Sequence, residues 1–330
     1  MKVLKQIPIT DANLIFSSVP ENDYDEWDYT ENYIAGAMVI VSSVHKVYRS
    51  LVHPNTNNNP LNEPQNDPDN LPMYWVEIGS TNRWQAFNGL RKELTVSDGT
   101  IEYLFAPSGI VDGIGIINAS CDTVEVEVLF GGSMIATLDD EILYTSNSLV
   151  LGGGYEVVFD KEYPMTTRVV TDWYEFFFKP FDIKKNLFIS DIPPYIGALI
   201  NIRLVRPVGE TSVGIIALGQ VNFIGHAIYG AQSDSRSFSR TEPNSFGITK
   251  LVKRPSKLIT RQTVYAPKAM TTYLSELREE LDATVSIWST IDDVNDEFFN
   301  AYIVNGIADR FIINADNYSQ TVVELELREI

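Results

Sequence analysis

The sequence is poor in the residues that form cross-links and metal centres. Its 330 residues include one cysteine, Cys121, which excludes a disulfide within the chain and a cysteine-rich zinc site. Of the three histidines, His45 and His53 are too far apart for the helical zinc motif of metalloproteases. His226 lies in an apolar run flanked by glycine, where a structural histidine is expected. We therefore expect neither a metal ion nor a cofactor.

Long apolar runs and several catalytic motifs are also missing. No run approaches the ~18 residues that a membrane helix needs, so we expect no membrane contact. The first residues contain lysines but no apolar segment of a secretory signal, so synthesis in a cytoplasm is expected. There is no Gly-x-Ser-x-Gly elbow and no phosphate-binding loop of the Gly-x-x-x-x-Gly-Lys-Ser/Thr type. We therefore predict that the chain is not an enzyme.

Basic residues are scarce relative to acidic ones. The chain has 25 lysines and arginines against 44 acids, which gives a net charge of −19. Such a surface repels nucleic acid, so no sequence-specific nucleic-acid partner is expected. Hydrophobic residues make up 44% and aromatic residues 11% of the chain, as is typical of a folded protein. The length allows two or three domains.

Residues 91–220 contain one short strand pattern after another. The segment 121–129 alternates valine with glutamate, as in an antiparallel strand with one face in water. Further segments predicted as strands, separated by turn clusters, are 100–106, 109–118, 135–143, 169–178, 183–190 and 198–207. Short strands at such spacing indicate a mainly β fold with an antiparallel β-sandwich or jelly-roll-like domain.

Residues 221–330 combine one helix with short strands. The apolar positions that repeat at helical spacing over 268–282 are Met270, Leu274, Leu277 and Leu281. Strands are predicted at 284–289, 298–305, 310–315 and 321–328. A helix followed by several strands is typical of a small C-terminal α+β domain, in which the helix packs on an antiparallel sheet.

Residues 1–90 are predicted to form an N-terminal arm with a long loop and an aromatic clasp. A strand is expected over 37–48, where β-branched residues are frequent. Residues 54–72 are rich in proline, asparagine and aspartate. Because proline fixes φ and removes a backbone donor, this segment is expected to be a loop.

The aromatic clasp lies in residues 75–89, which hold two of the five tryptophans. Residues 75–78 alternate like a short strand, and residues 79–82 have the chemistry of a turn. The guanidinium of Arg83 is expected to stack on the indole of Trp84. A compact unit of this kind must pack on a sheet or on a partner.

Acidic and aromatic residues alternate in an early segment. Residues 21–31 carry six acids and no base, interleaved with Tyr24, Trp27, Tyr29 and Tyr33. One interpretation is a docking segment for a basic partner surface. A second is a solvated acidic loop whose aromatic rings fold inward. A third is a calcium site, although the segment lacks the spacing of a calcium-binding loop.

A basic stretch in the second half contrasts with the acidic chain. Between residues 250 and 261 the sequence has five bases and no acid, namely Lys250, Lys253, Arg254, Lys257 and Arg261. The stretch could contact nucleic acid, or it could contact a neighbouring protein and receive the acidic segment 21–31 of another copy. A plain exposed strand face is the third interpretation.

The aromatic run 173–178 reads Trp-Tyr-Glu-Phe-Phe-Phe. In the strand predicted for this region, alternate rings face opposite sides, so at least one face should belong to a core. A platform that stacks on sugar rings is the alternative.

The run from Trp75 to Trp84 reads Trp-x-Glu-Ile-Gly-x-Thr-Asn-Arg-Trp, and it resembles a signature of structural proteins of tailed-bacteriophage particles. Residues 8–11 with 17–21, and residues 224–254, fit the same group. The resemblance implies a virion component of the tail, collar or baseplate, made in the bacterial host cytoplasm. It also implies a role in protein–protein assembly or fibre attachment. The implied partners are other copies of the chain and other virion proteins of the tail, portal or fibres.

Two alternatives stay open beside the virion component. The first is a carbohydrate-binding module for host surface glycans, because sandwich folds host many such sites. The second is a tail polysaccharide depolymerase, because 44 acids leave room for one carboxylate pair. Under the assembly hypothesis, the residues expected to bind partners are Tyr24, Trp27, Tyr29, Trp75, Arg83, Trp84, Lys250, Lys253, Arg254 and Lys257.

Overall fold

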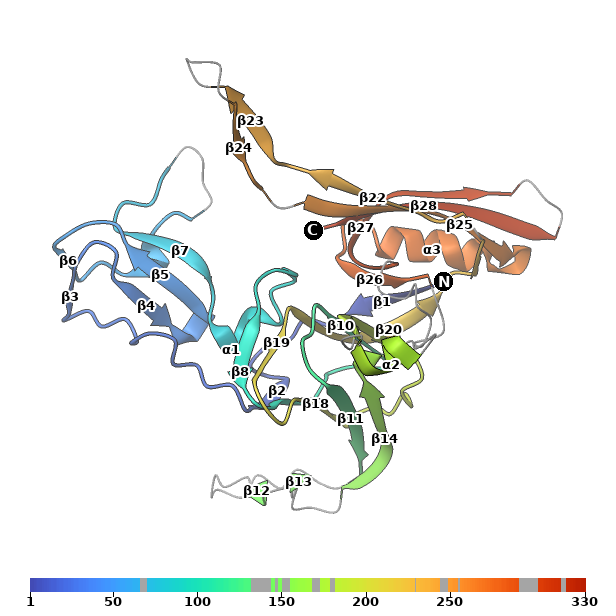
Figure 1. The fold of residues 1–330 in the computed structure, drawn as a ribbon, viewed down its shortest axis with the longest axis horizontal. Coiled ribbons are helices and arrows are strands. Elements are labelled where there is room, and N and C mark those ends of the chain that lie inside the picture. Colours follow the sequence, from blue (N-terminus) through green and yellow to red (C-terminus); the bar gives the residue numbers. More distant parts are fainter. Residues whose placement is uncertain are drawn as a thin grey trace.

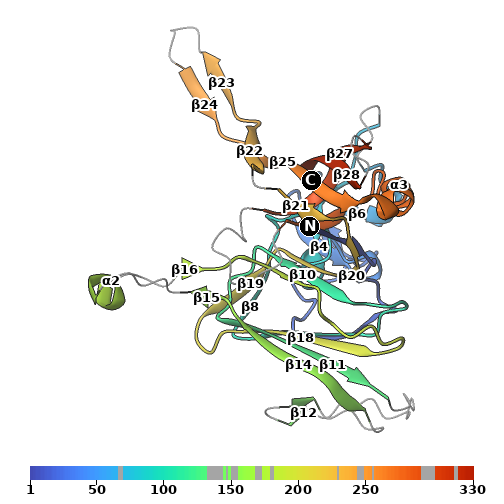
Figure 2. The same ribbon diagram turned by 90° about the vertical axis from the view of Figure 1, so that its right-hand side faces the viewer.

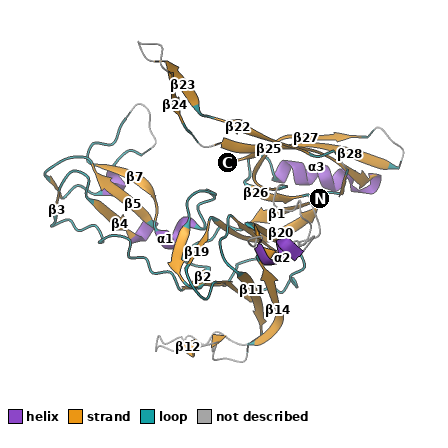
Figure 3. Cartoon of the chain, viewed as in Figure 1, coloured by secondary structure: helices purple, strands orange, loops and turns teal. Residues whose placement is uncertain are grey.

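The computed structural model is mainly β and antiparallel, as the sequence predicts (Figure 3). It describes residues 1–65, 70–131, 144–145, 148–149, 155–167, 173–178, 182–228, 230–243, 249–254, 256–290, 302–315 and 319–330. The strand predicted over 135–143 lies wholly outside these residues, and so does the centre of the loop predicted over 54–72.

A ten-stranded sheet runs through both halves of the chain. In spatial order its strands are β17 (Asn186–Ile189), β10 (Gly113–Ile117), β20 (Ile215–Phe223), β1 (Lys2–Gln6), β26 (Ser286–Ser289), β27 (Ile303–Asn314), β28 (Gln320–Glu329), β25 (Ser256–Pro267) and β21 (His226–Ala227), and β22 (Gln232–Ser237) also pairs with β25. The sequence analysis placed no strand at β1, yet β1 pairs with β20 on one side and β26 on the other. The division into three domains stays a prediction, and β20 crosses its boundary at residues 220 and 221.

A five-stranded sheet packs on one end of the large sheet. Its order is β14 (Glu156–Pro164), β11 (Thr123–Phe130), β18 (Leu199–Val205), β9 (Ile101–Phe105) and β2 (Leu14–Ser17). Val124, Val126 and Val128 of β11 are buried with Ile114 and Ile116 of β10 in one apolar cluster. The predicted alternation of 121–129 and the β-sandwich are therefore confirmed.

The C-terminal part curls around one helix, α3 (Thr271–Glu280), which follows a short 3-10 turn, η3 (Lys268–Met270) (Figure 1). Leu274, Leu277 and Leu281 are buried against Trp288 and Val323 of the sheet, so the predicted apolar stripe is confirmed. The segments predicted as two strands at 298–305 and 310–315 contribute to one strand, β27. The alternation predicted for 321–328 is the alternation of buried and half-buried residues in β28.

A smaller N-terminal lobe, here residues 21–80, stands beside this body (Figure 1). It holds the three-stranded sheet β4 (Met38–Val41), β5 (Lys46–Ser50) and β7 (Trp75–Ser80), the pair β3 (Asn32–Tyr33) and β6 (Asn55–Thr56), and two 3-10 turns, η1 (Ser42–Val44) and η2 (Pro60–Asn62). The single strand predicted over 37–48 is wrong. The chain reverses at η1 and at His45, whose φ of 56° lies in the left-handed region, so β4 and β5 form a hairpin.

Small pairs and short helices complete the described chain. They are β8 (Thr95–Asp98) with β19 (Glu210–Val213), β12 (Tyr144–Thr145) with β13 (Ser148–Leu149), β15 (Thr166–Thr167) with β16 (Asp182–Ile183), β23 (Arg240–Pro243) with β24 (Thr249–Val252), and the helices α1 (Asn82–Gln85) and α2 (Trp173–Phe178). Figure 2 shows α2 and the β23–β24 hairpin projecting from the body in different directions.

The prediction of a strand and a core row at 173–178 is wrong, because these residues form α2. Four of its aromatic side chains lie in solvent, with exposed fractions of 79% for Trp173, 72% for Tyr174, 68% for Phe177 and 71% for Phe178. The rings of Tyr174 and Phe178, four positions apart, lie 4.9 Å apart. Aromatic residues favour strands because they pack against neighbouring strands of a sheet. Here the ring contact is instead made between residues four apart in a helix.

The lone thiol offers a direct probe of the sandwich core. Cys121 is fully buried, and this burial raises the pKa of its thiol to about 12. We expect iodoacetamide to label the native protein about a thousandfold more slowly at pH 8 than the chain in denaturant, because the thiolate is the reacting form. Equal labelling rates in the two states would contradict the buried position.

Candidate functional site

The first tryptophan of the 75–84 motif anchors the long loop of the N-terminal lobe. Trp75 begins β7 and is fully buried in a cluster with Val39, Val41 and Tyr48. Its indole N–H donates to the carbonyl of Asn58 in the loop, at 2.8 Å. Buried tryptophan normally satisfies its N–H in this way, so the residue closes the loop over the small sheet.

The second half of the motif is a helical turn. The turn predicted over 79–82 is wrong in detail, because Gly79 and Ser80 end β7 and Asn82 begins α1. The side-chain amide of Asn82 both donates to the carbonyl and accepts from the N–H of Val96, each at 2.8 Å. Asn82 thereby extends the edge of β8 and fixes α1 to the body.

Trp84 stacks on a histidine and not on the neighbouring arginine. The rings of Trp84 and His45 are 4.0 Å apart with an interplanar angle of 18°. The predicted stacking of Arg83 on Trp84 is therefore wrong. Arg83 instead donates from Nε to the carbonyl of Val19 at 2.7 Å, and Tyr103 donates to the carbonyl of Arg83.

His45 bridges two carboxylates. Its Nδ1 lies 3.0 Å from Glu21 Oε1, and its Nε2 lies 3.0 Å from Asp11 Oδ2. An ionised carboxylate only accepts hydrogen bonds, so a ring protonated on both nitrogens donates to both carboxylates and a neutral ring donates to one of them. Glu21 also accepts from the hydroxyl of Thr81 at 2.7 Å, and its Oε2 lies 4.0 Å from Arg83 Nη1.

From here on we use the name clasp for this group and no longer for residues 75–89. Its residues are Asp11, Glu21, His45, Thr81, Arg83 and Trp84. It joins chain segments that are far apart in sequence, at the point where α1 connects the N-terminal lobe to the body (Figure 1). Sequence reasoning missed His45, Asp11 and Glu21 as members of one site. The sequence held one signal for this grouping. Residues 8–11, 17–21 and 75–84 all carry the resemblance to phage structural proteins, and the structure brings these three segments together.

The acidic segment 21–31 is largely bound to its own lobe. Asp23 accepts from the N–H of Asn82 at 2.8 Å, and Glu26 accepts from the N–H of Ser42 at 3.0 Å. Asp28 accepts from the N–H and the hydroxyl of Thr30, and these hydrogen bonds lower the pKa of the Asp28 carboxyl. These contacts use carboxylates that the sequence analysis offered to a partner.

The residues predicted to bind partners fall into two groups. Those in the interior or half-buried are Trp27, Trp75, Arg83 and Trp84, and Trp27 packs on the cluster around Trp75. Those at the surface are Tyr24 and Tyr29, with exposed fractions of 44% and 65%, together with Lys253 and Arg254. Lys257 is half-buried at the start of β25, and Lys250 lies in β24.

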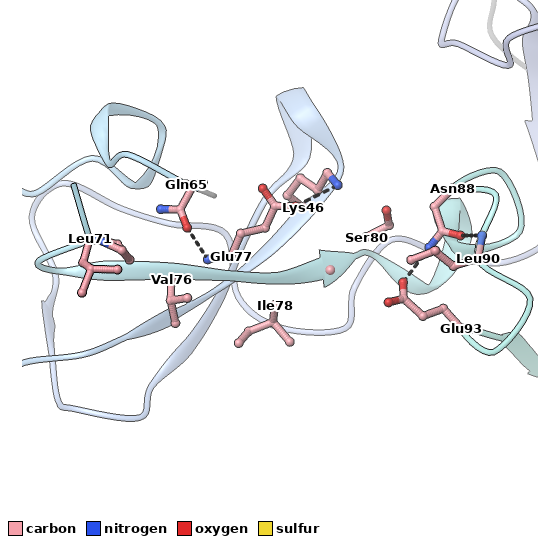
Figure 4. A pocket seen from close by; sticks show the side chains of 12 residues that line it. Lys46, Gln65, Leu71, Val76, Glu77, Ile78, Ser80, Asn88, Leu90 and Glu93 are labelled. Carbon is pink, nitrogen blue, oxygen red and sulfur yellow. Dashed lines mark hydrogen bonds and ion pairs between the residues drawn. The ribbon is translucent and has the colours of Figure 1, made fainter. Parts of the chain in front are cut away.

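A hollow of about 590 Å³ runs along β7 (Figure 4). Its carboxylates are held by groups of the same hollow, since Glu77 pairs with Lys46 at 3.0 Å and Glu93 accepts from Asn88 at 2.6 Å. Ile78 is 45% exposed and supplies an apolar wall. Both acids are therefore engaged by neighbouring side chains of the hollow.

The interactions described at this site are hydrogen bonds, ion pairs and side-chain packing. Among the described residues, no group of three or more His, Cys, Asp or Glu side chains is placed to hold a metal ion. None of the helices in the described ranges has the length and apolarity that crossing a bilayer requires. Comparison with models of known protein families and with curated proteins found no match.

The clasp makes a prediction about stability. Glu21→Ala removes the acceptor of the imidazole N–H and of the Thr81 hydroxyl, and both donors are shielded from water. We expect the free energy of unfolding to fall by about 1–3 kcal/mol, as is usual when buried donors lose their acceptor. Urea unfolding followed by tryptophan fluorescence measures the change.

The matched control for this measurement is Asp25→Ala, which removes an exposed acid of the same segment. A surface change of this kind should stay within about 0.5 kcal/mol of the parent. If both variants lost the same stability, or neither lost any, the clasp would not hold the lobe.

Proposed function

We propose that this chain is a non-enzymatic structural component of a tailed-phage virion. Its place is the tail, collar or baseplate, where it mediates protein–protein assembly or fibre attachment. The resemblance of residues 75–84 to a signature of such proteins supports the phage identity. The geometry supports the assembly role, through the elements that project from the body.

The observation that carries the assembly role is the exposure of large apolar side chains on projecting elements. Helix α2 presents Trp173 and Phe178 to solvent, and the hairpin of β23 and β24 carries Leu251, which is 66% exposed. Isolated exposed apolar residues are ordinary, but contiguous aromatic groups on one projecting element mark interaction sites. Tryptophan, tyrosine and phenylalanine are also the residues enriched where proteins bind one another.

The contacts of the acidic residues favour binding over catalysis. The carboxylates at the clasp and in the hollow along β7 accept hydrogen bonds from the chain's own N–H, O–H and ammonium groups. A glycosidase pair instead needs two carboxyls that face each other across a substrate. The clasp and the continuous sheet hold the projecting elements on a rigid frame, which reduces the entropy lost when they bind.

The proposed partners are other copies of the chain and other virion proteins of the tail, portal or fibres. The proposed location is the tail region of the virion, reached after synthesis in the bacterial host cytoplasm.

The particle that carries this chain provides the test. We expect mass spectrometry of purified particles to find the chain at a fixed ratio to the major tail protein. Antibody labelling in electron micrographs should place it at one position along the tail. Its absence from washed particles, with abundant chain in the infected cell, would contradict the proposal.

Helix α2 also supports one alternative, a module that binds host surface glycans. Its exposed aromatic rings are the groups that stack on sugar rings. In that case Trp173→Ala would abolish binding on a glycan array while the unfolding curve stays unchanged. Under the assembly proposal neither the parent nor the variant binds glycans.

A further inference from the structure

A basic ribbon projects from the ten-stranded sheet. We define it as the described residues 232–243, 249–254, 256 and 257, which form β22, β23, β24 and the start of β25. Across this span the sequence holds six bases against two acids, in a chain of net charge −19. Arg236, Lys253 and Arg254 are exposed, and among the described residues no carboxylate lies within ion-pair distance of these three side chains. These three residues of the ribbon therefore present positive charge that no ion pair among the described residues balances.

An acidic face lies on the outer side of the five-stranded sheet. Its carboxylates are Glu102 on β9, Glu125 and Glu127 on β11, and Asp160 and Glu162 on β14. In the register of β11 and β14, Glu125 lies opposite Glu162 and Glu127 opposite Asp160. Like charges directly opposite each other on neighbouring strands are destabilising, so this arrangement costs the free chain stability.

The acidic face has more acceptors than donors. Arg203 contributes positive charge, with Nη1 3.0 Å from Glu125 and Nε 3.9 Å from Glu102. Asn201, 1% exposed, donates from Nδ2 to Glu102 and Glu127, while its Oδ1 has no hydrogen-bond partner among the described residues. Burial raises the pKa of Glu125; Arg203 opposes this, and the neighbouring acids add to it. Such a face is complementary to a ligand rich in cationic N–H groups.

The ribbon and the acidic face lie at opposite ends of the molecule. In both views the β23–β24 hairpin is at the top, and β11 and β14 are at the bottom (Figures 1 and 2). The ribbon therefore does not reach the acidic face of its own chain. Segment 21–31 is the weaker candidate receptor, because Glu21, Asp23 and Glu26 already accept hydrogen bonds from their own chain.

We propose that the basic ribbon of one copy docks on the acidic face of the next copy. The inference deepens the assembly role proposed above and rests on it, because it names a second copy of this chain as the partner. A contact between two different surfaces is heterologous, so repeating it builds a closed ring or an open filament. Apolar groups accompany the charges on both sides, with Leu251 on the ribbon and Val157, 52% exposed, on β14.

Sedimentation of the full chain over a concentration series tests the contact. We expect self-association at low salt and its loss at ~0.5 M salt, where exposed charges are screened within a few ångströms. The double variant Lys253→Glu with Arg254→Glu should weaken association at least about tenfold, because like charges then meet. Asp160→Lys with Glu162→Lys should have the same effect. An equimolar mixture of the two variants should associate again, since each altered surface then meets its complement.

Two control variants carry the same charge change at other exposed positions. Lys92→Glu with Lys185→Glu is the control for the ribbon, and Asp25→Lys with Glu31→Lys is the control for the acidic face. Both should associate like the parent. A parent chain that stays monomeric at high concentration and low salt would overturn the proposal. So would association that survives the changes on β14 but is lost in the Asp25 and Glu31 variant.

This result is separate from the test of the virion role. A chain that associates as described but is absent from particles leaves the ribbon contact standing and removes the proposed function. A chain that is present in particles but associates through other surfaces supports the proposed function and overturns the ribbon contact.

Discussion

The placement of His45 is the constraint on which the arrangement of the two parts depends. Its imidazole ring lies between Asp11 and Glu21 and stacks on Trp84, so one side chain combines hydrogen bonding with aromatic contact. The partly buried carboxylate of Glu21 is stable only when it is hydrogen-bonded, and His45 and Thr81 meet this need. The three-residue turn before His45 and its left-handed backbone bring the ring to this position. The N-terminal lobe therefore keeps a defined orientation relative to the body.

The second constraint is the continuity of the ten-stranded sheet. Strand β1 connects the sandwich to the curled sheet around α3 by pairing with β20 and with β26. The approach of β1 to β20 is close enough that a side chain at Gly219 would overlap the carbonyl of Lys5, so glycine is required there. Strand pairing consequently runs without interruption from β22 of the ribbon, through β25, to β10 and β17 of the sandwich. A frame of this kind suits a chain that holds neighbours at fixed positions.

Sequence patterns predicted those elements in which burial is local and periodic. The alternation of β11 and β28 and the apolar stripe of α3 are of this type, because residues close together in sequence determine which face of the strand or helix is buried. Two features escaped prediction because they depend on distant partners. Strand β1 is too short and too polar in sequence to signal a central position. The aromatic run of α2 has the composition of a strand but forms a helix, in which the four aromatic side chains that the structure describes are exposed.

The candidate site was likewise predicted only where the signal lies within one segment of the sequence. The motif from Trp75 to Trp84 lies in the part of the chain that forms the clasp, but Asp11, Glu21 and His45 come from three other segments, and spacing carries no information about them. One interpretation of the acidic segment 21–31 was a docking segment for a partner, whereas the backbone N–H groups of Ser42 and Asn82 already bind two of its carboxylates. The acidic face of β11 and β14 becomes visible only from the register of the two strands, which sets like charges side by side.

The central claim is that this chain acts by holding other copies and other proteins through charged and aromatic surfaces on a rigid frame. Zero-length carbodiimide cross-linking of a mixture of isotopically light and heavy full-length chains tests it most directly. The account predicts mixed-isotope cross-links that join Lys253 or Lys257 of one copy to Asp160 or Glu162 of another. Cross-links found only within single copies, or between copies only at residues 21–31, would contradict it.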